Sequence, residues 1–269
     1  MYLIDYHIHT DCSPDAEDNA MIVCEYAVRA GMREIAITDH YECNGWEGGS
    51  EIYYDKMQAL FTMKKAASVF SDHLLLRCGV ELGQPTQNRA AADKLLAGDT
   101  YYDFVLASLH NLKGRPDFYF LDYEKEDIPA LFTRYLTELE EIVDYGNFDC
   151  LGHLTYPLRY LAKAGKKLDL APFEEQIRHV LRRLVDAGKG LEINTSGLRG
   201  ELGETMPGAE ILRMYKQIGG EILTVGSDAH SCKAAGAGIE QAMALAEHIG
   251  FEYIATFSNR RVYMIPMNA

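Results

Sequence analysis

The chain has 269 residues, of which 48% are hydrophobic and 25% charged, a balance typical of a globular protein with a sizeable core. Its 26 lysines and arginines are outnumbered by 40 aspartates and glutamates, and the net charge of -14 disfavours long nucleic acid as a partner. No hydrophobic run approaches the roughly 20 residues that a membrane-spanning helix needs. We therefore expect a protein that neither crosses a membrane nor binds long nucleic acid.

The cysteines and the N-terminus bear on location and domain organisation. The six cysteines form no CxxC pair, and MYLIDYHIHT lacks the basic leader and hydrophobic region of a signal peptide. We therefore expect reduced thiols and a cytoplasmic protein. No linker divides the chain, and α/β barrels of this length often form one domain, so we expect a single domain over residues 1–269. The sequence carries no signal for the oligomeric state.

Short hydrophobic runs alternate with amphipathic segments along the chain. The runs cover residues 2–8, 34–38, 74–80, 103–109, 148–152, 190–194, 221–226 and 252–257. Most are continuously hydrophobic, as expected of parallel strands that are covered on both faces. Helical periodicity is clearest in residues 127–145, where Asp127 is placed to cap the first turn, and recurs in 173–186 and 239–249. The alternation predicts an α/β fold.

Glycines separate several of the helical segments from the strands that follow them. Gly31, Gly188, Gly219 and Gly250 each follow a helical segment and precede a predicted strand by two or three residues. Glycine readily adopts the left-handed conformation that ends many helices. Seven or eight strands joined in this way favour a closed barrel. An open doubly wound sheet is the alternative, because the order of the strands cannot be read from the sequence.

Metal-ligating residue types gather at the ends of the predicted strands. Six of the nine histidines lie there, namely His7, His9, His40, His110, His153 and His230. Three carboxylates share this placement: Asp15, Glu81 and Asp228. In a barrel of parallel strands the carboxyl ends open on one rim, which carries the active site. We therefore expect these nine side chains to lie together.

Such a cluster predicts bound metal. Six imidazoles and three carboxylates are too many for a proton relay, and their charges are costly to desolvate without partners. Because one ion takes about three or four protein ligands, nine candidates predict two or three ions. Taken singly, each residue has an ordinary alternative: Asp15 could cap a helix, Glu81 could be an exposed strand end, and Asp228 could stabilise a turn. Nitrogen and carboxylate ligands suit zinc, manganese or iron.

Two further features are candidates for binding a substrate. Arg159 and Arg199 lie just beyond strand ends and are candidates for a bidentate grip on an anionic group, with Arg115 a weaker third. The alternative is that they are solvated loop arginines. The loop after His40 carries Glu42, the only tryptophan, Trp46, and Glu47, which are candidates for contacting a cationic substrate group. The alternative is that this loop only packs on the barrel.

These motifs, in their order, resemble those of the PHP (polymerase and histidinol phosphatase) metallohydrolases over essentially the whole chain. The resemblance rests on HIHTDCSPD, ITDH, GVELG, SLH, GH and GSDAH. The length, and the pairing of YPLR with EINTSGLR, are most similar to the stand-alone histidinol-phosphate phosphatases. The resemblance implies a distorted seven-stranded α/β barrel with a trinuclear site of zinc, manganese or iron at its rim. The final run, EYIATFSNRRVYMIP, would then be a last short strand or a closure of the barrel.

The resemblance also implies which residues bind each metal ion. His7, His9, Glu81 and Asp228 would bind one ion, and Glu81 would bridge to a second ion held by His110 and His153. Asp15, His40 and His230 would hold the third. Some relatives have histidine at the position of Asp15, which bears on the metal preference of that third position. Asp39 and Asn194 are candidates to orient ligands, although ordinary backbone hydrogen bonding would also explain them.

The reaction expected from these residues is hydrolysis of a small phosphomonoester, with L-histidinol phosphate of histidine biosynthesis as the substrate. A hydroxide shared by two ions at Glu81 would attack phosphorus. Glu81, Asp228, Arg159 and Arg199 are the candidate catalytic residues, and Arg159, Arg199, Trp46 and Glu42 the candidate substrate contacts. One alternative is a PHP phosphoesterase that acts on nucleotides, short oligonucleotides or phosphotyrosine. Another is a metal-binding protein without catalytic activity.

Overall fold

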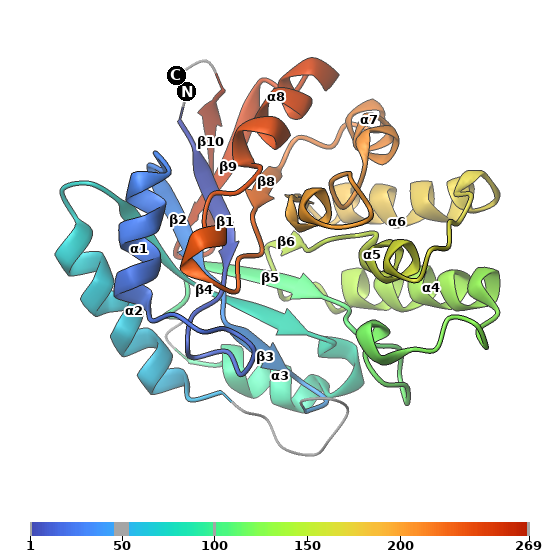
Figure 1. The fold of residues 1–269 in the computed structure, drawn as a ribbon, viewed down its shortest axis with the longest axis horizontal. Coiled ribbons are helices and arrows are strands. Elements are labelled where there is room, and N and C mark those ends of the chain that lie inside the picture. Colours follow the sequence, from blue (N-terminus) through green and yellow to red (C-terminus); the bar gives the residue numbers. More distant parts are fainter. Residues whose placement is uncertain (1, 46–53, 99–100, 268–269) are drawn as a thin grey trace.

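The computed structural model describes residues 2–45, 54–98 and 101–267, in which a mostly parallel sheet is surrounded by helices (Figure 1). The sheet follows the order β1-β2-β4-β5-β6-β7-β8, and every neighbouring pair in it is parallel. These strands are Ile4–Ile8, Glu34–Ile37, Leu75–Gly83, Phe104–Ser108, Cys150–Leu151, Gly190–Asn194 and Leu223–Gly226. A short strand that the hydrophobic pattern did not predict, β3 (His40–Glu42), pairs with β4 beside the sheet.

The two ends of the sheet meet and nearly close a barrel. The amide of His9 donates to the carbonyl of Ala229 at 2.9 Å, and the amide of Asp228 donates to the carbonyl of His7 at 2.7 Å. An isolated parallel bridge joins Ile8 to Ala229 between them. The prediction of a distorted seven-stranded barrel is therefore confirmed, and the alternative of an open doubly wound sheet is wrong.

Eight helices cover the described parts of the barrel (Figure 1). They are α1 (Ala20–Arg29), α2 (Lys56–Phe70), α3 (Arg89–Leu96), α4 (Ile128–Tyr145), α5 (Tyr156–Lys163), α6 (Glu174–Asp186), α7 (Ala209–Gln217) and α8 (Ile239–Ile249). The three helices predicted from periodicity, α4, α6 and α8, are present, and the carboxylate of Asp127 caps α4 by accepting from the amide of Ala130 at 3.1 Å. Among the described segments, no helix has the length and hydrophobicity that a bilayer crossing requires.

The predicted helix-ending glycines adopt the left-handed conformation. The φ angles of Gly31, Gly188, Gly219 and Gly250 are 81°, 65°, 90° and 102°. Each return from helix to strand is therefore short, which keeps the opposite, carboxyl ends of the strands free for longer loops.

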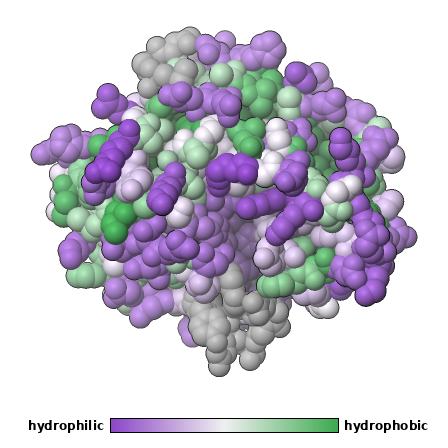
Figure 2. Space-filling view, in the orientation of Figure 1, coloured by the Kyte–Doolittle hydropathy of each residue, from purple (hydrophilic) through white to green (hydrophobic). Residues whose placement is uncertain are grey.

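Hydrophilic side chains predominate on the molecular face seen in Figure 2.

The predicted strand over residues 252–257 is present, but it lies in a separate two-stranded sheet and adds no eighth strand to the barrel. Residues 253–266 form an antiparallel hairpin of β9 (Tyr253–Ser258) and β10 (Arg261–Pro266). The ring of Phe257 lies 5.0 Å from that of Phe104 and 6.4 Å from that of Tyr6, between centroids. The amide of Phe257 donates to the hydroxyl of Tyr6 at 2.9 Å. The hairpin is thus fixed against the barrel strands without joining their ladder.

Candidate metal centre

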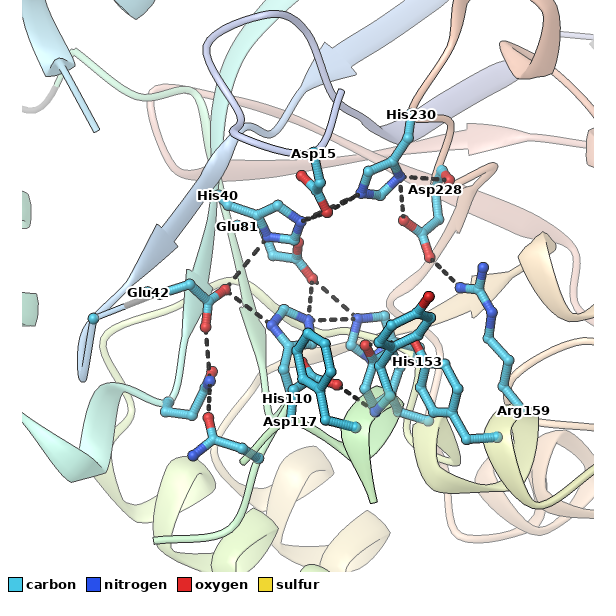
Figure 3. Close-up of a pocket in the computed structure, with 17 residues that line it drawn as sticks. Asp15, His40, Glu42, Glu81, His110, Asp117, His153, Arg159, Asp228 and His230 are labelled. Atoms are coloured by element: carbon cyan, nitrogen blue, oxygen red, sulfur yellow. Dashed lines mark hydrogen bonds and ion pairs between the residues drawn. The ribbon is translucent and has the colours of Figure 1, made fainter. Parts of the chain in front are cut away.

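Glu81, in β4, lies at the centre of the nine predicted residues, which the structure brings together at the carboxyl ends of the strands (Figure 3). Its side chain is completely buried. One oxygen, Oε2, lies 3.3 Å from His7 Nε2 and 3.6 Å from His9 Nε2. The other, Oε1, lies 3.1 Å from His110 Nε2 and 3.0 Å from His153 Nε2. The two oxygens of one carboxylate thus face two separate histidine pairs.

A third group lies beside this carboxylate. Oδ2 of Asp15 is 3.1 Å from His230 Nε2 and 3.6 Å from His40 Nε2, while His40 Nδ1 is 2.8 Å from Glu81 Oε2. Asp15 does not cap the following helix, because the side chain of Asn19 performs that role for α1. His40 therefore connects the third group to the central carboxylate.

Asp228 joins the first and third groups. Its Oδ1 lies 3.5 Å from His9 Nε2, 3.5 Å from His230 Nδ1 and 3.7 Å from His7 Nε2. The backbone of Asp228 has a φ of 53°, in the left-handed region that residues other than glycine rarely adopt. Strained backbone of this kind persists where the surrounding contacts enforce it, often at functional sites.

Residues behind the cluster orient its imidazoles. Nδ1 of His7 lies 2.7 Å from Glu192 Oε1, and Nδ1 of His110 lies 2.9 Å from Glu42 Oε1. A carboxylate accepts the Nδ1 proton, so each Nε2 presents its lone pair toward Glu81. The sequence analysis missed Glu192, although an acid inside the hydrophobic run GLEIN was the available signal.

The two predicted orienting residues act through neighbours. Asp39 accepts from the hydroxyl of Ser13 at 2.8 Å, and this hydroxyl lies 3.2 Å from His9 Nδ1. The side-chain amide of Asn194 donates to Glu192 Oε2 at 3.2 Å. Asp39 therefore acts on His9 through Ser13, and Asn194 acts on His7 through Glu192, although its side-chain nitrogen also lies 3.4 Å from His7 Nδ1.

The carboxylate of Glu81 is held in its ionised form despite its burial. Burial raises the pKa of Glu81, but the facing histidines His7, His110 and His40 outweigh this and hold it well below the usual value. For His7, burial favours the neutral ring, yet Glu192, Glu81 and Asp228 raise its pKa well above the usual value. Glu81 thus remains ionised, which is the form of a carboxylate that binds metal.

The chemistry of the cluster fits divalent metal. His7 Nε2, His9 Nε2 and Glu81 Oε2 are buried and have no hydrogen-bond partner among the described residues. Leaving such atoms unsatisfied is costly, and an ion among them would satisfy all three. Four triads have ligand atoms within 4.8 Å of one another: His7–His9–Glu81, Glu81–His110–His153, His9–His40–His230 and His40–Glu42–His110. The first two fall within two of the sets expected from the sequence; the third has His9 where Asp15 was expected, and the last adds Glu42, which was expected to contact substrate.

A pocket of about 310 Å³ opens over this cluster. Arg159 lines it and donates to Ser196 Oγ at 3.2 Å, with Asp228 Oδ2 3.5 Å away. Arg199 does not line the pocket; it is exposed and donates to the carbonyl of Asp228 at 3.1 Å. Arg115 pairs with Glu126 away from the pocket. Trp46 and Glu47 lie outside the described residues.

Sequence patterns did not predict the remaining residues of the pocket wall. Asp117, Tyr119, Phe120, Tyr156 and Tyr160 line one side of it, and Gln84 and Asn111 lie nearer to Glu42. The amide of Gln84 donates to Glu42 Oε2 at 2.7 Å. These residues come from the loops after β4 and β5 and from α5, and no local pattern predicts their position over the rim.

Comparisons with known proteins agree with this arrangement. Histidinol-phosphatase of Lactococcus lactis is 27% identical to this chain over 267 residues, which span 97% of each chain. The probable histidinol-phosphatase of Thermotoga maritima is 29% identical over 262 residues, covering 97% of this chain and 98% of that protein.

Solved structures give the same result. The crystal structure of histidinol phosphate phosphatase from Lactococcus lactis, in complex with zinc, L-histidinol and phosphate, superposes with a TM-score of 0.83 at 25% identity, over 97% of this chain and 98% of that one. A Listeria monocytogenes structure at 18% identity, with a TM-score of 0.73 over 88% of this chain and 99% of that one, shares the fold. The family model described as the PHP domain matches residues 5–196. The chain therefore belongs to the PHP domain family.

Proposed function

We propose that this protein is a metal-dependent phosphomonoesterase that hydrolyses L-histidinol phosphate to L-histidinol and phosphate, a reaction of histidine biosynthesis in the cytoplasm. The observation that carries the proposal is the buried Glu81, whose two oxygens face separate histidine pairs at the floor of a pocket that also contains Arg159. The Lactococcus lactis relative with zinc, L-histidinol and phosphate supports the choice of substrate. The whole chain, residues 1–269, is proposed to act as one catalytic domain.

The proposed cofactor is a set of three divalent ions, zinc, manganese or iron. His7, His9, Glu81 and Asp228 would hold one ion, Glu81, His110 and His153 a second, and Asp15, His40 and His230 the third. When bound, such ions activate water as a nucleophile and neutralise phosphate charge. Glu42 was expected to contact substrate. We assign it a second role, because its carboxylate contacts Nδ1 of His110 and so orients that ring; it also lies in a triad with His40 and His110.

The residues of the chain itself are proposed to position the phosphoester. Arg159 extends into the pocket from α5, and its guanidinium suits the planar grip on phosphate oxygens. Ser196 and Asp228 hold Nη1 of Arg159 in place. Arg199 supports the left-handed backbone of Asp228 through the carbonyl of that residue, so its proposed contribution to phosphate binding is partly indirect.

The test is release of inorganic phosphate from L-histidinol phosphate beside mononucleotides, a short oligonucleotide and phosphotyrosine, with protein purified without chelator. Preferred turnover of L-histidinol phosphate is the expected result. Preferred turnover of a nucleotide or of phosphotyrosine would retain the metal chemistry and overturn the substrate. Inactivity of metal-loaded protein on every phosphoester would favour a metal-binding protein without catalytic activity.

A further inference from the structure

Asp117 differs from the other carboxylates that line the pocket. Five carboxylates lie in its wall: Asp15, Glu42, Glu81, Asp117 and Asp228. Each of the other four has an oxygen within 3.5 Å of a histidine nitrogen. Asp117 forms no ion pair with any lysine, arginine or histidine in the part of the chain that the structure describes. Its Oδ1 accepts from the backbone amide of Tyr119 at 2.7 Å.

Aromatic side chains surround this carboxylate. Asp117 precedes a short 3-10 helix, η3 (Phe118–Phe120), on the loop after β5. Tyr119 and Phe120 are about half exposed, at 53% and 54%, and both line the pocket. The ring of Tyr119 lies 5.8 Å from that of Tyr160. Figure 3 places Asp117 on the side of His110 and His153, away from Asp15 and His230.

The pocket wall therefore carries two kinds of binding group. Arg159 is the only lysine or arginine among the described lining residues. Together with metal ions held by the proposed ligands, it would bind the phosphate of the substrate. Asp117 and the ring of Phe120 offer a negative charge beside an aromatic face. The rings of Tyr119 and Tyr160 already contact the cations of Lys163 and Arg159, at 4.6 and 5.8 Å. Ammonium and imidazolium groups bind to such surroundings through charge-assisted hydrogen bonds and cation–π contacts. Glu42 is less available for this purpose because His110 and Gln84 already occupy its oxygens.

We propose that Asp117 binds the positively charged part of the substrate and sets a preference for phosphomonoesters whose alcohol carries an ammonium or imidazolium group. Asp117 is thereby a specificity residue, while metal and Arg159 act on the phosphate. The inference rests on the proposed function, since L-histidinol phosphate is such an ester. The sequence suggested that the loop after His40 contacts the cationic group of the substrate; this proposal assigns that contact to the loop after β5.

The substitution Asp117→Asn tests this inference with little risk to folding. Asparagine keeps the side-chain oxygen that accepts from the amide of Tyr119, so η3 retains its cap. The matched control is Asp122→Asn, which removes the same charge from an exposed position that does not line the pocket. The kinetic constants of each protein are measured for L-histidinol phosphate and for p-nitrophenyl phosphate, whose leaving group carries no positive charge. L-Histidinol is also measured as an inhibitor of p-nitrophenyl phosphate hydrolysis.

We expect Asp117→Asn to raise KM for L-histidinol phosphate about tenfold or more, the loss typical of one charge-assisted hydrogen bond. KM for p-nitrophenyl phosphate should stay within about twofold, and the control should match the wild type on both esters. Inhibition by L-histidinol should weaken in parallel. Equal effects on the two esters, or no effect on either, would overturn the role of Asp117 and leave the proposed function standing.

Failure of the proposed function gives a different pattern. In that case the wild-type protein hydrolyses p-nitrophenyl phosphate but not L-histidinol phosphate. Inhibition by L-histidinol then decides the role of Asp117 alone. Inhibition that weakens in Asp117→Asn would support binding of a cation there, and inhibition that is absent or unchanged would overturn it.

Discussion

Nδ1 of His7 lies 2.7 Å from Oε1 of Glu192, and both side chains are buried. The same carboxylate accepts from the backbone amide of His153 at 2.8 Å through Oε2. One acid in β7 thus fixes the ring of a histidine in β1 and the backbone that carries a histidine after β6. The geometry on both sides of Glu81 depends on this acid, which is not itself a proposed ligand.

Replacing Glu192 with glutamine should therefore weaken metal binding without removing a ligand. Glutamine keeps the shape of the side chain but loses the charge that favours Nδ1–H of His7, and such changes typically lower metal affinity about ten- to a hundredfold. Elemental analysis after dialysis against graded chelator measures the loss. Glu138→Gln is the control, because Glu138 is a buried carboxylate on α4 that contacts the amide of Lys113 instead. Wild-type metal retention by Glu192→Gln would contradict the prediction.

Arg159→Ala should impair binding of the phosphoester while metal content stays intact. Because Arg159 lines the pocket and a charge-assisted hydrogen bond is lost, we expect KM to rise about tenfold. Arg199→Ala should raise KM less, because Arg199 lies outside the pocket lining and contacts the carbonyl of Asp228. Steady-state kinetics beside elemental analysis checks both variants. Unchanged KM in Arg159→Ala would remove this residue from the phosphate site.

Gly226→Ala should destabilise the barrel where its two ends meet. A Cβ at this position would lie 2.3 Å from both Cβ of His7 and Oε1 of Glu192, so β8 would have to move away from β1. Overpacking of this kind costs about 2 kcal/mol in the free energy of unfolding. Denaturant unfolding of metal-free protein measures it. The control is Gly200→Ala, where an added Cβ would meet nothing within 4 Å and a change below about 0.5 kcal/mol is expected. Equal stability of the two variants would refute the argument.

The sequence predicted the barrel and the convergence of its site because both depend on local signals. His7 and His9 lie two apart near the end of a hydrophobic run, and the same strand-end placement recurs at His110 and His153. Parallel strands bring those ends to one rim, so local placement becomes spatial proximity. The left-handed glycines followed from the same reasoning.

Other features depend on contacts between distant segments. Glu192 lies within a run that is otherwise typical of a buried strand, and its partner His7 is 185 residues away in the chain. Asp117 enters the pocket only because its loop folds back over the rim. The final hairpin did have a local signal, because asparagine is favoured in two-residue hairpin turns and Asn259 lies between the two strands. In the structure, Asn259 and Arg260 have the left-handed φ angles of such a turn, 49° and 63°.

The most direct test of the account is to titrate metal-free protein with zinc while measuring phosphate release from L-histidinol phosphate. The account predicts no release without metal, and a rise that levels off between about two and three equivalents of zinc per chain. Asp228→Asn should need more zinc to reach its plateau, because Asp228 joins two of the proposed sets. Phosphate release that does not depend on added metal, or none at saturating zinc, would contradict the central claim.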